Sequence, residues 1–145
     1  MALLRDPNLG GSSTDSGSLA ASFGNEKQQS EAIKSAKAFS AAAKSGKFRI
    51  DPEVAKAAIK EIARAEEAMR QIRHDVGIVT QSPKIGSSPY AERAVGWYED
   101  GGQSCRKAVL NFEKVLSYTR EGYEYAVESY ERIDADRAQT FDRGL

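Results

Sequence analysis

The stretch CRKAVLNFEKVLSYTREGYEYAVESYERI, residues 105–133, decides which fold the chain can adopt. Apolar and aromatic residues recur in it at alternating steps of four and three, and the residues between them are mostly Glu, Lys, Arg and Ser. The recurring positions are Cys105, Val109, Phe112, Leu116, Thr119, Tyr123, Ala126, Tyr130 and Ile133. This spacing predicts a long helix that packs lengthwise against a partner helix.

A second segment with the same pattern supplies the partner helix. Asp51 suits the N-cap position, Pro52 suits the first turn, and Glu53 favours the positive end of the helix dipole. The apolar positions that follow are Ala55, Ala58, Ile62, Ala65, Met69, Ile72, Val76 and Val79. Small alanines facing the large side chains of the other helix would interdigitate, so we expect an antiparallel hairpin over residues 48–145.

The segment between the two long helices has the composition of a turn. Residues 81–88 include a proline and a glycine, and Ser88 followed by Pro89 matches a new helix start. The sequence Asp-Gly-Gly-Gln at 100–103 then interrupts the second helix. We expect either a kink at these glycines or a fresh helix that Asp100 caps.

The N-terminal part of the chain differs from the hairpin. Residues 1–24 are rich in Gly and Ser, which predicts a disordered arm. Residues 25–47 are rich in Ala and Lys, and predict a short helix that ends at Gly46 and either packs on the hairpin or frays. Because no segment alternates like a β-strand, we expect an all-α protein: this arm, this short helix and the coiled-coil-like hairpin.

Composition argues against several functional classes. Lysine and arginine together equal aspartate and glutamate at 21 each, so no net field draws the chain to nucleic acid. No stretch approaches the roughly 20 apolar residues of a membrane helix, which predicts no stable membrane insertion. The first 24 residues lack the basic start and apolar run of a secretory signal, so we expect synthesis in the cytoplasm.

The residue types that carry most enzyme chemistry are scarce and scattered. His74 is the only histidine and Cys105 the only cysteine, which excludes an internal disulfide and a cysteine-based metal cluster. We interpret Cys105 as a buried small hydrophobe on the apolar seam. No phosphate-binding glycine loop or serine elbow occurs. We predict a protein that is not an enzyme and that has no catalytic residues, metal or cofactor.

Aromatic side chains suggest where another protein would bind. Tyr118 and Tyr125 are seven residues apart, off the main seam, and rigid amphipathic side chains of this kind are good anchors for a partner. They could equally cover the Lys-rich helix of residues 25–47. Trp97 follows Gly96 near the predicted turn, where it could plug the end of the hairpin or serve as a docking residue.

The end of the second helix carries Tyr130-Glu131-Arg132-Ile133-Asp134, with Tyr and Asp four apart on one helical face. Together with the Ile-Asp-Pro-Glu start at residues 50–53 and the Gly96–Trp97 pair, the chain resembles the small helical-hairpin proteins of actinobacterial type VII (ESX) secretion. The EspC-like branch of the WXG superfamily is the most similar, over roughly residues 48–142. The chain departs from the family's Trp-x-Gly turn, because Gly96 precedes Trp97.

The resemblance implies a function in export. In that family a Tyr-x-x-x-Asp/Glu motif, here Tyr130 and Asp134, is part of a secretion signal that a secretion ATPase recognises. The turn motif, here Gly96 and Trp97, lies beside the tail of a partner in a homodimer or heterodimer with a related hairpin or effector. The resemblance therefore implies that the protein is secreted or associated with the cell envelope. The alternative is a cytoplasmic adaptor or scaffold that is never exported and binds another helix through Tyr118 and Tyr125.

Overall fold

The computed structural model describes residues 25–47 and 49–144, which form three helices. These are α2 (Glu26–Lys44), α3 (Pro52–Val79) and α4 (Pro89–Arg143). The prediction of an all-α chain is confirmed, because the described residues contain no strand. The predicted disordered arm, residues 1–24, lies outside the described residues.

Each helix begins at a polar cap that satisfies a free backbone N–H group. The side chains of Asn25, Asp51 and Ser88 accept hydrogen bonds from backbone N–H groups two or three residues further on. Pro52 and Pro89 follow two of these caps and need no hydrogen bond at the first helical position. The starts predicted at Asp51 and Ser88 are therefore confirmed.

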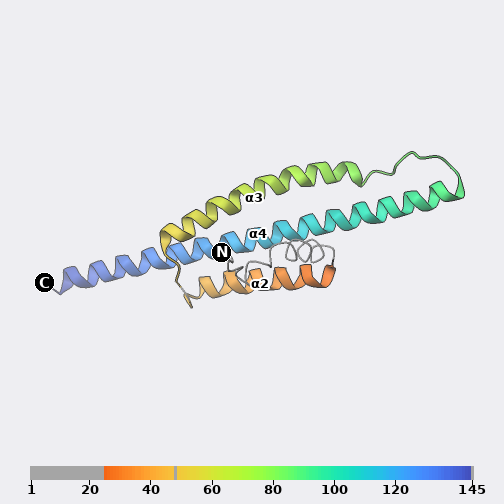
Figure 1. The fold of residues 1–145 in the computed structure, drawn as a ribbon. Coiled ribbons are helices and arrows are strands. Elements are labelled where there is room, and N and C mark those ends of the chain that lie inside the picture. Colours follow the sequence, from red (N-terminus) through yellow and green to blue (C-terminus); the bar gives the residue numbers. More distant parts are fainter. Residues whose placement is uncertain (1–24, 48, 145) are drawn as a thin grey trace, which may run out of the picture.

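The second helix of the hairpin is one continuous helix. α4 has 55 residues and is about 80 Å long at 1.5 Å per residue. Its ribbon passes through residues 101 and 102 without interruption (Figure 1). The interruption predicted there, including the fresh start at Asp100, is wrong. A Cβ atom on Gly102 would lie 2.5 Å from the Val79 carbonyl oxygen, so this glycine serves a close helix–helix approach.

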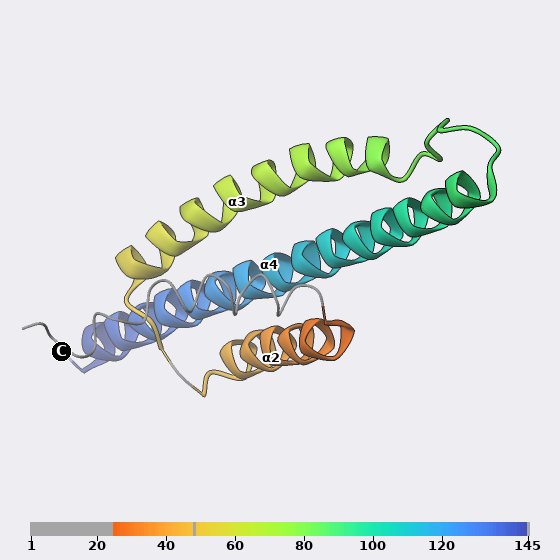
Figure 2. The same ribbon diagram turned by 45° about the vertical axis from the view of Figure 1, so that its right-hand side comes forward.

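α4 is the centre of the fold. It lies between α3 and α2, as both views in Figures 1 and 2 show. α3 runs antiparallel to α4 and α2 runs parallel to it. Both packed pairs involve α4, and no residue of α2 has its Cα within 8 Å of one in α3. The three helices therefore form an open layer and not a closed bundle.

The hydrophobic core is thin because only two helices meet at any point. Met69, Val76 and Val109 are its buried centre, and Phe112 and Leu116 pack against them half-buried. Among the described residues, no large side chain is completely buried. The layer thus leaves apolar side chains of α4 in partial contact with water, a common property of surfaces that bind another protein.

Replacing Gly102 by Ala tests the close approach of α3 and α4. The added methyl group would meet the backbone of Val79, which cannot rotate away, so we expect the free energy of unfolding to fall by about 1–3 kcal/mol. Gly101→Ala is the matched control, because a Cβ there would meet nothing within 4 Å. It should be neutral or stabilise by up to about 1 kcal/mol. Urea denaturation followed by circular dichroism measures both, and equal losses would contradict the packing.

Candidate partner-binding surface

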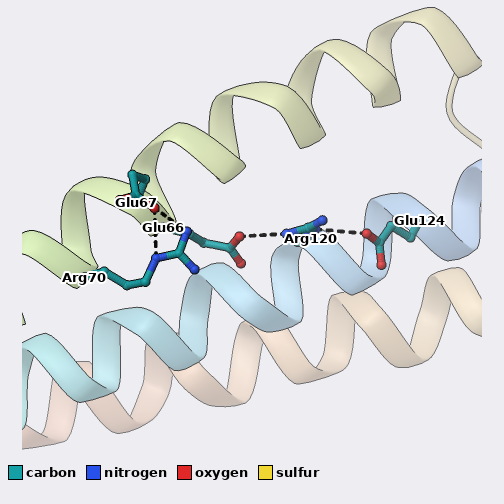
Figure 3. Close-up of polar contacts among 5 residues, drawn as sticks. All are labelled: Glu66, Glu67, Arg70, Arg120 and Glu124. Atoms are coloured by element: carbon teal, nitrogen blue, oxygen red, sulfur yellow. Dashed lines mark hydrogen bonds and ion pairs between the residues drawn. The ribbon is translucent and has the colours of Figure 1, made fainter.

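Two ion pairs between the helices fix α3 on one face of α4. Arg120 Nη1 lies 2.8 Å from Glu66 Oε2, and Arg73 Nη1 lies 3.2 Å from Glu113 Oε2. Figure 3 shows Arg120 between Glu66 of α3 and Glu124 of its own helix, 2.9 Å away. Because these side chains are partly exposed, each pair contributes at most about 1 kcal/mol. Their main effect is to define the antiparallel register.

The charge of Arg120 is secure across the physiological range. Hydrogen bonds to Glu124 and Glu66, and the charges of both carboxylates, raise the pKa of its guanidinium further above its usual value. A raised pKa means that the folded chain holds this proton more tightly than the unfolded chain. The stabilisation that this proton provides is therefore complete at neutral pH and is lost as the pH rises through the pKa of the guanidinium, in strongly alkaline solution. Arg120 is not a pH switch.

α2 lies on the opposite face of α4 in a single register. Three hydrogen-bonded side-chain pairs join the two helices: Glu26 with Lys107 at 2.7 Å, Gln29 with Asn111 at 2.7 Å, and Ser40 with Glu121 at 2.9 Å. The partners are 81 or 82 positions apart in every pair. A constant separation in sequence means that the helices run parallel, with matching residues side by side.

Phe39 packs on α4 at a position that has no side chain. A Cβ atom on Gly122 would overlap the Phe39 ring, so the ring lies directly against the helix backbone. The same ring meets Tyr123 edge to face, with ring centroids 5.2 Å apart and an interplanar angle of 61°. Such a pair adds about 0.5–1.5 kcal/mol to the burial of apolar area. This contact holds the C-terminal half of α2.

Tyr118 and Tyr125 lie beneath α2. The Nζ atom of Lys37 is 5.3 Å from the centroid of the Tyr118 ring, and that of Lys44 is 5.5 Å from the Tyr125 ring. Two interpretations of these tyrosines were open, and the structure agrees with the one in which they pack against the Lys-rich helix. Both tyrosines are half-buried there, so a partner protein could reach only part of each ring while α2 stays in place.

Between its two covered faces, α4 has one apolar side and one polar side. At 3.6 residues per turn, residues 18 positions apart lie on one line along a helix. Ala94, Phe112 and Tyr130 form such a line, and none of the three is fully exposed. The opposite side carries polar residues such as Ser117 and Glu128, both exposed. The apolar side is the candidate surface for a partner.

The middle of the apolar side is a hollow of about 320 Å³ between α3 and α4. We call it the apolar flank; its lining residues are Met69, Cys105, Ala108, Val109 and Phe112. The expectation that Cys105 is buried is wrong, because the thiol-bearing residue is exposed. The physical reason is the open layer: no third helix covers this side of α4.

The turn-end patch is a second hollow, of about 400 Å³, at the start of α4. It is lined by Ile85, Tyr90, Ala94, Trp97 and Tyr98. Trp97 is 66% exposed and therefore does not plug the hairpin. Gly96 and Trp97 are helical residues and not turn residues, because the turn ends at Ser88 and α4 begins at Pro89. The turn position expected for this pair is corrected accordingly.

The tail patch is at the other end of α4, where Ile133, Asp136, Arg137, Thr140 and Phe141 line a hollow of about 460 Å³. Phe141 is 79% exposed. Tyr130 is half-buried and Asp134 is exposed just before this patch. Because Tyr130 comes 33 positions after Trp97 in the same helix, the two lie about 50 Å apart. Within one chain they cannot form a joint site.

No group of three or more His, Cys, Asp or Glu side chains among the described residues is placed to hold a metal ion. Within the described part of the chain, His74 is exposed and its Nδ1 atom lies 3.4 Å from Oδ1 of the neighbouring Asp75. None of the three helices is long and apolar enough to cross a membrane.

Several residues of these surfaces have no counterpart among the sites expected from sequence. Phe39 and Gly122 hold α2, and Tyr90, Tyr98 and Phe141 enlarge the two end patches. A glycine in the middle of a long amphipathic helix was a usable signal for close packing. The exposed aromatics gave no such signal, because burial depends on which side of α4 stays uncovered.

Comparisons with known proteins found no match: no protein-family model, no curated protein and no solved structure is similar to the chain. The candidate surface therefore stands on the contacts and exposure of its own residues.

Trp97→Ala distinguishes a docking residue from a structural plug. Because the side chain is largely exposed, we expect the free energy of unfolding to change by less than about 0.5 kcal/mol. Met69→Ala, in the buried centre, should cost about 2–4 kcal/mol. Denaturant titrations followed by circular dichroism measure both. A loss for Trp97→Ala as large as that for Met69→Ala would show that Trp97 is part of the core.

Proposed function

We propose that the protein acts by binding another protein along the apolar side of α4, without catalysis. The observation that carries this proposal is that the turn-end patch, which includes Ala94, and the apolar flank, which includes Phe112, lie along one line on one side of a single helix. An amphipathic helix laid along such a groove is a common mode of protein recognition. The partner would bury apolar surface that the open layer leaves in contact with water.

The partner in this proposal is a helical hairpin, either a second copy of the chain or a related protein or effector. A hairpin laid antiparallel on α4 would bring its own tail end to the turn-end patch. Two copies would thereby place Trp97 of one chain near Tyr130 of the other. The separation of about 50 Å within one chain supports an arrangement of two chains, since no single chain can bring these residues together.

The proposal extends to export by type VII secretion, as substrate or as partner of a substrate. It follows the resemblance to the EspC-like proteins, in which Tyr130 and Asp134 would be read by the secretion ATPase. Asp134 is exposed and Tyr130 is accessible in part, which such reading requires. The place of action would then be the medium or the cell envelope.

The alternative is a cytoplasmic adaptor that uses the same apolar side and is never exported. The partial burial of Tyr130 favours this alternative, because a half-buried tyrosine also has an ordinary packing role. In an adaptor, Tyr130 and Asp134 would have no role as a secretion signal.

Fractionation of the native host tests the export proposal. The chain should occur in the medium or envelope, and Asp134→Asn should retain it in the cytosol with unchanged abundance. Asp142→Asn is the matched control: it removes the same charge from another exposed residue of α4 that lines none of the three hollows, and export should persist. Tyr130→Phe and Tyr130→Ala then distinguish the contribution of the hydroxyl group to export from that of the aromatic ring.

If the unchanged chain stays in the cytosol at normal abundance, the export proposal fails and the adaptor alternative remains. If Asp134→Asn and Asp142→Asn reduce export equally, the effect is one of general charge and the motif has no special role. Circular dichroism of each variant confirms that the helices are intact before export is compared.

A further inference from the structure

Over residues 101–123, the apolar side of α4 is low in its first half and raised in its second half. Residues within about 40° of the line through Ala94, Phe112 and Tyr130 recur there at steps of three and four. The side chains before Phe112 are small, and those after it include a leucine and a tyrosine. Each residue of the series is at least partly exposed; in chain order they are Gly101, Cys105, Ala108, Phe112, Leu116, Thr119 and Tyr123.

The low half contains the hollow of the apolar flank. Cys105 and Ala108 line this space of about 320 Å³ together with Met69 of α3. None of the lining side chains is a strong hydrogen-bonding group, so a polar side chain placed there would lose water without gaining a partner. The hollow therefore suits an aliphatic or aromatic side chain of another molecule.

The whole line from Ala94 to Tyr130 can be covered without burying a charge. The residues within about 40° of this line are all uncharged. Thr119 donates its hydroxyl hydrogen bond to the Val115 carbonyl of its own helix at 2.7 Å, so this hydroxyl needs no donor or acceptor from outside. A molecule that covers the line would leave no charge buried and unpaired.

The line is long enough for a stable interface with a layer of helices. Tyr130 comes 36 positions after Ala94, which is about 54 Å along α4. A helix about 10 Å wide offers roughly 540 Å² over this length, whereas stable pairs bury about 800 Å² on each partner. The adjoining edge of α3 adds area, because Met69 lines the hollow and Ile72 is 43% exposed. A partner of stable affinity would therefore cover both helices.

We propose that the apolar side pairs with the same side of a second copy of the chain, antiparallel and centred on Phe112. This inference rests on the proposed function and names its partner. Phe112 is the midpoint between Ala94 and Tyr130, so pairing centred there overlaps the full length of the line. Residues equally far before and after Phe112 then lie at the same level of the pair.

Antiparallel pairing of two copies sets the raised half of each on the low half of the other. Leu116 of one copy lies at the level of Ala108 of the other, beside the hollow, and Tyr123 lies at the level of Gly101. Each of these pairs forms twice, because a two-fold axis relates the copies. A different protein would need large and small residues in this same reversed order, whereas a second copy has them already.

Sedimentation equilibrium of the full-length chain tests the association. The chain should pass from monomer to dimer as its concentration rises. Gly101→Tyr should raise the dissociation constant at least about tenfold, because the new ring would occupy the place of Tyr123 from the other copy. A Cβ at Gly101 meets nothing within 4 Å, so the monomer accepts this change. Ser117→Tyr, on the exposed polar side, is the matched control and should leave the dissociation constant unchanged.

A disulfide bond between two chains tests the register. The proposed pairing brings Cys105 of one copy to the level of Thr119 of the other, so Thr119→Cys should link two chains under mild oxidation. Within one chain these positions are about 21 Å apart along α4, which is too far for a disulfide. Ser117→Cys places the second thiol on the polar side and should link few chains.

Two results would overturn this inference. One is an unchanged chain that stays monomeric at every concentration, a result that does not depend on the folding of any variant. The other is a dimer in which Thr119→Cys links no more chains than Ser117→Cys.

The labelling rate of Cys105 in the monomer distinguishes failure of this inference from failure of the proposed function. If the chain is monomeric and its thiol reacts rapidly, the apolar side is open and only the pairing of two copies fails. If the chain is monomeric and its thiol is protected, the chain covers this side itself, and the proposed function fails as well.

Discussion

The fold depends on close contact at two points where α4 has no side chain. At Gly122 the Phe39 ring of α2 lies against the helix backbone, and at Gly102 the end of α3 brings its Val79 carbonyl against α4 from the other face. A helix that must accept two neighbours on opposite faces needs such gaps, because its larger side chains already fill the remaining contacts. The cost is two glycines within a 55-residue helix, about 1 kcal/mol each in helix propensity.

The consequence of this arrangement is an open layer with a continuous apolar side. Because α2 and α3 never meet, nothing in the described chain covers the side of α4 that carries Phe112 and Trp97. The same separation leaves the ion pairs of Arg120 and Arg73 near water, where they determine register more than stability. Association with another helix would compensate for the thin core, which links the packing of the fold to its proposed function.

Much of the fold could be predicted from the sequence, because helix periodicity and caps are local properties. The caps at Asp51 and Ser88 and the all-helical content follow from residues a few positions apart. The continuous path through Gly101 and Gly102 could not, since the contact with Val79 that explains Gly102 is a tertiary one. The exposure of Cys105 and Trp97 could not be predicted from the sequence either, because it depends on which side of α4 the other helices leave open.

The native thiol of Cys105 allows the most direct test of the open layer, because it lies in the apolar flank. The measurement is the rate at which a small thiol reagent labels Cys105 in the dilute, folded chain, compared with the rate in the denatured chain. An open flank predicts labelling nearly as fast as in the denatured chain, and slower labelling when a partner hairpin is bound. Strong protection of the thiol in the dilute chain would mean that the helices close over this side of α4, and would contradict the account.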